Sequence, residues 1–254
     1  MLERRDHRWF YLYLALSMSV AAYWGFTYTY FIPNLTGEYP PVSKAVHVHG
    51  WSFFLWYLLL PLQAFLIASR RRRLHVTLGM ASVALAAVMV FTGVLVASVR
   101  VDHGLSAADP DEFTIFWKNF GQLIMYNMVL FAGFYVAAIV YRARPRVHKR
   151  LIVLASASAL VAALFRIIVG LCGFYWLDTP GWVMPTAFFL PLLFVGVGIA
   201  HDLIVRGAVD RTYLVGVPIF VALHGFGLIT AGTAVGDAAS GIMAAFAHIF
   251  GALY

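Results

Sequence analysis

The stretch ALFRIIVG, residues 163–170, places one arginine, Arg166, in the middle of an apolar run. A cation at membrane depth costs several kcal/mol, so it normally faces a protein interior, a cavity or a ligand. The other Lys, Arg, Asp and Glu residues fall in loops or at the ends of apolar segments. The sequence therefore predicts a membrane protein in which Arg166 is the one such residue buried inside a membrane segment, at a binding site.

The composition agrees with that class. Of the 254 residues, 62% are hydrophobic and only 11% are charged, which is typical of a polytopic membrane protein. Cys172 is the single cysteine, which excludes disulfides within the chain and cysteine-based metal sites. Met1 to Arg8 is charged and no small-residue cleavage site follows, so no cleavable signal peptide is expected.

Seven apolar segments are long enough to cross a bilayer core of about 30 Å, which takes about 20 helical residues. Charged residues, Pro and Gly separate them. The predicted helices are 9–32, 46–68, 76–99, 119–141, 150–176, 182–205 and 212–233. A tail at 242–254 is too short to span and is expected along the membrane interface. The predicted fold is thus one all-α transmembrane domain over residues 1–254.

Basic residues predict the orientation of this bundle. The N-terminal segment and the second, fourth and sixth loops hold 3 + 4 + 5 + 2 = 14 of the 18 Lys and Arg residues. The opposite side holds Lys44, Arg100 and Lys118, and Arg166 completes the count. The positive-inside rule therefore predicts a cytoplasmic N-terminus and an external C-terminus. The net charge of +7 comes from these flanks and needs no nucleic-acid partner; the expected partner is the lipid bilayer.

A first group of polar residues is expected in the outer half. His49 shares a face of the second helix with Gln63, whereas His47 points to the other side. By residue count, Arg166 and His224 lie about 15 Å below the outer surface at 1.5 Å per residue. The prediction is a pocket that opens outward, and its lining residues are His49, Gln122, Asn127, Arg166 and His224. The alternative for Arg166 is a purely structural role, in which it hydrogen-bonds backbone carbonyls or Asn127.

A second group is expected at the inner face. Its members are His75, His148, His201 and Asp202. Imidazoles with one carboxylate suit Zn, Fe or Cu, and haem iron would take two of the imidazoles as axial ligands. No two of these residues have a metal-motif spacing such as H-E-x-x-H, so their convergence depends on tertiary packing.

Three classes of function follow from these groups. The first is an electron-transfer protein that binds haem b or a transition metal, with His49 and His224 as the favoured ligands and His47 as a further candidate. The second is a transporter or binding protein for a small anionic or lipid-like ligand, with Arg166 as counter-charge. Its further candidate ligand-binding residues are Asn127, Gln122 and Gln63. The third is an accessory or assembly subunit of a membrane complex. The chain lacks G-x-S-x-G, H-E-x-x-H and Walker motifs, and enzymatic activity stays open.

Several short motifs resemble a widespread group of uncharacterised bacterial seven-helix membrane proteins. They are the run from His47 to Gly50 with Trp56 and Gln63, the run Arg73-Leu74-His75 with Leu78 and Gly79, and the run from His148 to Leu151. The resemblance covers about residues 28–170 and implies a multi-pass protein of the bacterial cytoplasmic (inner) membrane. A looser similarity is to cytochrome b561-type proteins, whose axial histidines lie on helices two and four and on helices three and five. His75 and His148 match the second pair in helix number, but the fourth helix has no histidine to complete the first pair.

Overall fold

The computed structural model describes residues 3–109, 111–173 and 179–254, with residues 3–8 as backbone alone. This part of the chain is helical and holds no strand, so the all-α prediction is confirmed. The elements are α1 (Glu3–Phe26), the π-helical segment η1 (Thr27–Phe31), α2 (Ile32–Thr36), α3 (Lys44–Ala68), α4 (Arg72–Ser106), α5 (Glu112–Val140), α6 (Pro145–Ala159), α7 (Val161–Cys172), α8 (Val183–Phe189), α9 (Leu192–Arg206), α10 (Arg211–Thr230), α11 (Ala234–Phe250) and the 3-10 segment η2 (Gly251–Leu253).

Six helices in the described residues are long and apolar enough to cross a membrane. They are α3, α4, α5, α8 together with α9, α10, and α11 together with η2. The pair α6–α7 is bent by 47° and makes a seventh if it counts as one span. α1, expected to span at 9–32, is helical but is not in this set, because its Tyr and Trp residues lower its mean hydropathy.

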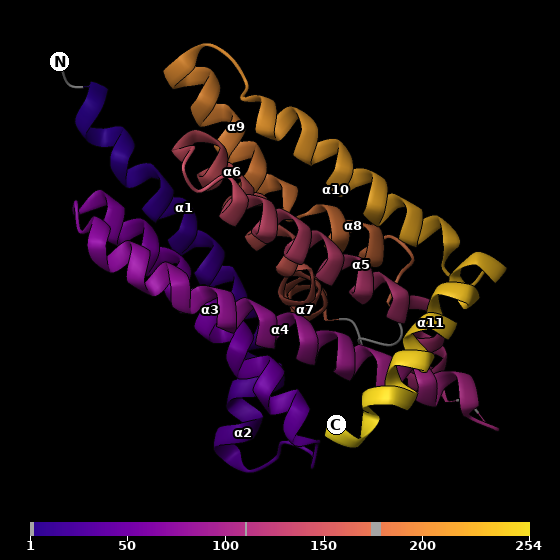
Figure 1. Ribbon diagram of the computed structural model, residues 1–254. Coiled ribbons are helices and arrows are strands. Elements are labelled where there is room, and N and C mark those ends of the chain that lie inside the picture. Colours follow the sequence, from indigo (N-terminus) through magenta and orange to yellow (C-terminus); the bar gives the residue numbers. More distant parts are fainter. Residues whose placement is uncertain (1–2, 110, 174–178) are drawn as a thin grey trace.

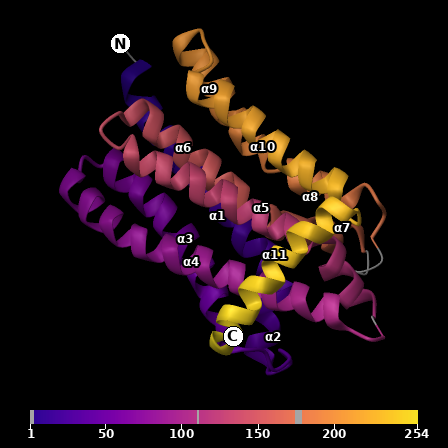
Figure 2. The ribbon, with the colours of Figure 1, turned by 45° about the vertical axis from the view of Figure 1, so that its right-hand side comes forward.

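The predicted tail at 242–254 is wrong in length. α11 begins at Ala234, after the cap residue Thr233, and with η2 it reaches the length of a membrane span. Its first turns carry Gly236, Asp237 and Ser240, which interrupt the apolar run, so the sequence pattern places the start of the segment too late. In both views α11 runs across α4 and α5 instead of alongside them (Figures 1 and 2).

The bundle has two distinct ends. The N-terminal segment and the turns at 69–71, 141–144 and 207–210 lie at one end, which we call the basic end (Figures 1 and 2). The opposite end, called here the acidic end, holds α2, the α4–α5 connection and the C-terminus. Loops predicted to share a side therefore do so, and 14 of the 18 Lys and Arg residues fall in or beside the basic end.

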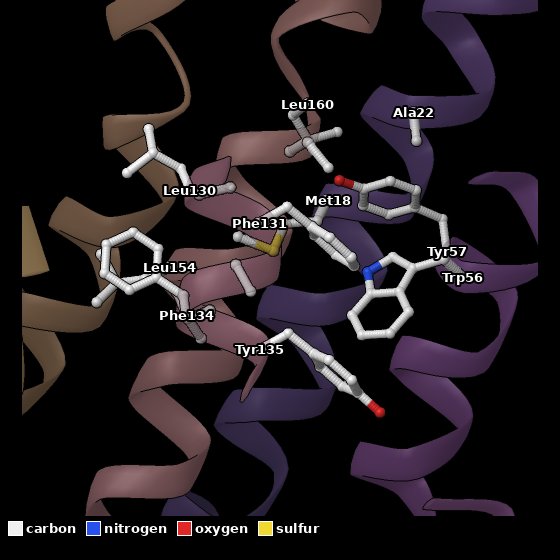
Figure 3. Close-up of a cluster of buried hydrophobic side chains, with 14 of the residues drawn as sticks. Met18, Ala22, Trp56, Tyr57, Leu130, Phe131, Phe134, Tyr135, Leu154 and Leu160 are labelled. Atoms are coloured by element: carbon white, nitrogen blue, oxygen red, sulfur yellow. The ribbon is translucent and has the colours of Figure 1, made fainter. Parts of the chain in front are cut away.

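The core lies between α1, α3, α5 and α6 (Figure 3). Trp56 and Tyr57 of α3 are buried there beside Phe131 and Tyr135 of α5. Both α3 side chains hydrogen-bond Ser156 of α6: the indole N–H of Trp56 donates to its hydroxyl at 3.2 Å, and the Tyr57 hydroxyl donates to its carbonyl at 2.5 Å. In an apolar medium, where water cannot compete, these bonds fix α3 against α6.

Two helices extend further than predicted, and one is broken. α4 and α5 continue into polar sequence toward the acidic end, whereas the apolar runs alone suggested 76–99 and 119–141. The predicted fifth helix, 150–176, begins earlier, at Pro145, and breaks at Leu160 between α6 and α7. Its expected last residues, 174–176, lie outside the described residues. The break redirects α7, which carries Arg166.

Candidate functional site

Two imidazoles from different helices meet at the basic end. His75 lies in the first turn of α4 and His148 in the first turn of α6. Their ring centroids are 6.4 Å apart and their planes are nearly perpendicular, at 89°. Nδ1 of His148 donates to the Ala138 carbonyl at 2.8 Å, and Nδ1 of His75 lies 3.3 Å from the Gln63 carbonyl oxygen. In the described residues, no hydrogen bond occupies Nε2 of either ring.

Local sequence explains why the two rings come together. The α3–α4 turn closes through Arg70, whose φ of 64° lies in the left-handed region, and this tight reversal lays the start of α4 against the end of α3. α6 begins with Pro145, which suits a first helical turn because its missing N–H has no partner to lose. Each histidine therefore packs its Nδ1 edge against the end of the preceding helix.

Gln63, which shares a helix face with His49 by sequence, contacts His75 in the structure. With its side-chain nitrogen turned toward His75, Gln63 donates to Nδ1 at 2.6 Å, and its side-chain oxygen accepts from the Gly79 N–H at 2.9 Å. In that orientation the proton of a neutral His75 sits on Nε2. If the Gln63 amide rotated, its side-chain oxygen would accept from Nδ1–H of His75. Nε2 of His75 would then carry no proton and would have an available lone pair.

The number of donor side chains limits what this imidazole pair could bind. In the described residues no group of three His, Cys, Asp or Glu side chains could hold a metal ion. Haem iron, by contrast, needs only two axial imidazoles from the protein. Two imidazoles thus match the number of protein ligands of a b-type haem, and fall short of the three or four protein ligands of a usual metal-ion site.

The remaining inner residues form a separate ionic cluster. Arg150 is 1% exposed and Asp202 0% exposed, and they pair through two hydrogen bonds, Nη2 to Oδ1 and Nε to Oδ2, the latter at 2.7 Å. Nη1 of Arg150 also donates to the Arg146 carbonyl at 2.6 Å. Asp202 thus pairs with a guanidinium and, in the described residues, makes no hydrogen bond or ion pair with His75 or His148. The ring of His201 stacks on that of Phe10, with centroids 3.8 Å apart.

This cluster corrects the expectation that Arg166 is the one such residue buried in a membrane segment. Arg150 and Asp202 are more deeply buried than Arg166, which is half-buried. The sequence placed Arg150 in a basic loop because four other Arg or Lys residues precede it from position 142. The sequence signal for this pair was Asp202, because an acid on the last turns of an apolar helix indicates a buried basic partner.

Asp210 joins the cluster at the start of α10. Burial alone would raise the pKa of Asp210, but hydrogen bonds from the Thr212 N–H and hydroxyl and from Arg206, together with the charge of Arg150, lower it to about 2. Its carboxylate caps α10, with the Thr212 N–H at 3.0 Å and an Arg206 nitrogen at 2.6 Å. Asp210 is therefore ionised at any physiological pH, and it adds a second negative charge beside Arg150.

The outer group does not assemble as one pocket. His224 is 0% exposed, and its Nε2 lies 2.6 Å from Oδ1 of Asn127, so these two predicted residues do meet. His49 turns instead toward α4, where Nδ1 lies 3.1 Å from the Met89 carbonyl and the ring packs against Gly93. In the described residues, neither a hydrogen bond nor a ring contact joins His49 to His224.

Gln122 lies beneath α11. It is 0% exposed, and neither of its side-chain amide atoms has a hydrogen-bond partner among the described residues. A Cβ atom added to Gly236 of α11 would lie 2.7 Å from the Gln122 nitrogen, so glycine permits the close approach. Gln122 therefore faces the covering helix.

Arg166 contacts α1 and η1 instead of the polar residues of α5 and α10. Its Nε donates to the Thr29 hydroxyl at 3.1 Å and its Nη1 to the Ala162 carbonyl at 2.9 Å. The guanidinium carbon lies 4.4 Å from the centre of the Phe26 ring, within cation–π distance. Neither Asn127 nor His224 takes part.

The small-residue face that Arg166 shares with α6 and α7 is divided at the bend. Ala155, Ala159 and Ala163 are buried, but Gly170 and Gly173 are exposed. The small residues before and just after the break thus support close packing, whereas those beyond Arg166 do not. Arg166 marks the place where this face leaves the bundle interior.

His47 occupies a second aromatic environment. Its Nδ1 lies 3.0 Å from the Tyr30 hydroxyl, and its ring centroid lies 5.8 Å from that of Tyr39. His47 and His49 therefore face different neighbours, as their spacing on a regular helix predicts.

Comparison of the chain with models of known protein families, with curated proteins and with solved structures finds no match. The assignment of function therefore rests on geometry. Among the predicted site residues, His75, His148 and Gln63 meet at the basic end, and His224 meets Asn127.

Proposed function

We propose that this protein is a multi-pass protein of the bacterial cytoplasmic membrane that carries electrons through a b-type haem bound by His75 and His148. The observation that carries the proposal is the imidazole pair, with centroids 6.4 Å apart and both Nε2 atoms without a hydrogen bond in the described residues. The similarity of helix positions to cytochrome b561-type proteins supports it. Among the described residues, His49 and His224, the ligands favoured by sequence, make no ring contact with another imidazole.

The chain supplies the ligands and their orientation. A hydrogen bond from Nδ1–H to a backbone carbonyl, as at His148, fixes the tautomer that leaves Nε2 free and raises the basicity of the ring. His75 reaches the same tautomer when the Gln63 amide turns its oxygen toward Nδ1. When bound, haem iron would cycle between its ferric and ferrous states, the chemistry that electron transfer requires.

The basic end also provides charge for the haem propionates. Arg72 and Arg73 precede His75 on α4, while Arg144 and Arg146 precede His148. Arginine binds carboxylates through charge-assisted hydrogen bonds, so these residues suit a dianionic macrocycle at the cytoplasmic surface. The proposed orientation, with this end in the cytoplasm, follows from the same basic residues.

The absorption spectrum of the purified protein tests the proposal. Protein produced with an adequate haem supply and purified without chelator is expected to show a Soret band and one haem per chain. His75→Ala and His148→Ala should each remove most of the bound haem. His103→Ala, which changes an exposed residue at the far end of α4, is the matched control and should retain it.

Two results would contradict this assignment. One is wild-type protein without haem or Soret absorbance. The other is a Soret band that persists in both inner variants and disappears in His49→Ala or His224→Ala, which would move the ligands to the outer half.

A further inference from the structure

Unpaired polar atoms gather where α11 crosses α4 and α5 (Figures 1 and 2). They are both side-chain amide atoms of Gln122, the Ser98 hydroxyl and the indole N–H of Trp117. Gln122 and Ser98 are each 0% exposed, and none of these atoms has a hydrogen-bond partner among the described residues. Burying such groups costs free energy, because they lose their hydrogen bonds to water. Their grouping therefore indicates that a hydrogen-bonding partner belongs beside them.

Ser98 lies on the face of α4 that packs against α11. On this face, Phe91 lies two turns before Ser98, and its ring centroid is 5.8 Å from that of Phe250 in α11. Asp102 lies one turn after Ser98, and its Oδ1 is 3.0 Å from Nε2 of His248, also in α11. Residues at this spacing share one side of a helix, so the Ser98 side chain faces α11 between these two contacts.

Trp117 and Gln122 approach the same helix from α5. Trp117 packs against the cluster that Met243 of α11 forms with Ala97 of α4, so its ring lies where the three helices meet. The Gln122 side-chain nitrogen lies beneath Gly236 of α11, where an added Cβ atom would be only 2.7 Å away. All three side chains with unpaired atoms therefore lie against one covering helix.

The attachments of α11 suit a cover that moves. A short connection at 231–233 joins α11 to α10, and Gly232 within it has a φ of 70°, in the left-handed region that favours glycine. Near the other end of α11, the pair of His248 with Asp102 is exposed to solvent, and exposed ion pairs contribute little stability. The buried residues of α11 are mostly small: Gly236, Ser240, Met243, Ala244 and Ala247. The helix therefore buries little apolar area for its length.

The unpaired atoms define the chemistry of their missing partner. An indole N–H only donates, whereas an amide and a hydroxyl both donate and accept. A matching ligand therefore carries several acceptor oxygens and at least one O–H group. Among the residues that the structure describes, no charged side chain bonds these atoms, and an unpaired charge would be costly here, so a neutral ligand fits best. Ser98 and Gln122 lie near the acidic-end limits of the apolar runs 76–99 and 119–141, a depth that lipid headgroups and external solutes both reach.

We propose that Ser98, Trp117 and Gln122 bind a neutral glyceryl group, and that α11 moves aside to admit it. The neighbouring oxygens of a glyceryl group accept from the indole and amide N–H groups, and its hydroxyls donate to the amide and serine oxygens. The source is either the headgroup of a neutral lipid or free glycerol. This site lies at the opposite end of the bundle from the imidazole pair and does not rest on the haem assignment.

Ligand-induced thermal stabilisation tests the proposal and separates the two sources. The full chain, purified in a detergent without hydroxyl groups, is titrated with monooleoylglycerol, methyl oleate or glycerol. Methyl oleate is the matched control, because it keeps the acyl chain and the ester but has no hydroxyl. A saturable rise in melting temperature with monooleoylglycerol beyond that with methyl oleate assigns a lipid headgroup. A rise with glycerol that saturates well below the concentrations at which osmolytes stabilise proteins in general assigns free glycerol.

Variants separate binding from stability. Gln122→Leu and Ser98→Ala remove atoms that have no partner in the ligand-free protein, so its melting temperature should not fall. Both should weaken the apparent affinity for the stabilising glyceryl compound by about tenfold, the usual weight of one hydrogen bond. Trp117→Phe keeps an aromatic ring without the N–H and should have the same effect on affinity. Ser106→Ala is the matched control, because the Ser106 hydroxyl bonds a carbonyl of its own helix, and it should retain the wild-type affinity.

Two results would overturn the proposal. One is the absence of saturable stabilisation by either glyceryl compound beyond that by methyl oleate. The other is wild-type affinity in Gln122→Leu, Ser98→Ala and Trp117→Phe alike. If Gln122→Leu does not fold, the other two variants decide.

Discussion

At the scale of single residues, the pair Arg150–Asp202 carries a large energetic consequence. Both side chains are withdrawn from water, so each charge has lost its hydration and depends on the other. Replacing a whole buried ion pair by apolar groups is often nearly neutral, whereas removing one partner is strongly destabilising. The pair joins α6 to α9 and, through Asp210, to the start of α10.

Asp202→Asn is therefore expected to lower the free energy of unfolding by about 3–5 kcal/mol, because it leaves the guanidinium without a full counter-charge. The double variant Arg150→Met with Asp202→Leu should lose less than the single variant. Denaturant titrations in detergent micelles would measure both. A double variant less stable than Asp202→Asn would show that the pair itself contributes net stability.

The two arginines also show what sequence could predict at this scale. Hydropathy singled out Arg166 because it interrupts an apolar run, but the burial of Arg150 depends on Asp202, a residue 52 positions away. Likewise, the meeting of His75 with His148 is set by two helix starts, and no spacing within either helix encodes it. The candidate residues were readable from sequence, but their grouping was not.

At the scale of elements, α1 and α7 approach closely through one glycine. A Cβ atom at Gly25 would overlap the backbone of Ala163, so only glycine permits this contact. The contact lies next to Phe26 in α1 and close to Arg166 in α7, and it positions the guanidinium over the ring.

Gly25→Ala is expected to destabilise the protein by about 1–3 kcal/mol, the usual cost of overpacking a tight contact. Gly170→Ala on α7 meets nothing within 4 Å and should stabilise it by about 0.5–1 kcal/mol through the better helix propensity of alanine. Thermal melts of the two variants against wild type measure the difference. Equal effects would mean that the α1–α7 contact relaxes freely.

Element boundaries divide into those set locally and those set by packing. The turns at Arg70, at Pro145 and after Arg206 follow from charge, Pro and Gly, and sequence places them within a few residues. The polar extensions of α4 and α5, the π-turn of η1 and the bend at Leu160 depend on neighbouring helices. Hydropathy carries no signal for these features.

At the scale of the whole molecule, the ends of the bundle differ in charge. The basic end gathers four chain segments that are distant in sequence, and the positive-inside rule predicts that they face the cytoplasm. The side on which the C-terminus lies depends on α11. Its length would allow it to span the membrane, but both views show it crossing α4 and α5. A spanning α11 would return the C-terminus to the basic side.

Reporter fusions distinguish these arrangements. Fusions at Arg71 and Arg144 are expected to report the cytoplasm, and fusions at Asp109 and Tyr254 the external side. Fusions at the two basic turns serve as internal controls for insertion. A cytoplasmic signal at Tyr254 alone would show that α11 spans, whereas a cytoplasmic signal at Asp109 would reverse the whole topology.

The position of α11 also has a consequence for the order of assembly. α11 follows α4 and α5 in the chain and leaves the ribosome after them. It then closes over Gln122, and the Ser240 hydroxyl donates to the Lys118 carbonyl at 3.3 Å. Until that moment the Gln122 amide is uncovered. Biogenesis of this protein therefore passes through a stage in which a polar patch is accessible, and a chain truncated before Ala234 would display that patch to chaperones and proteases.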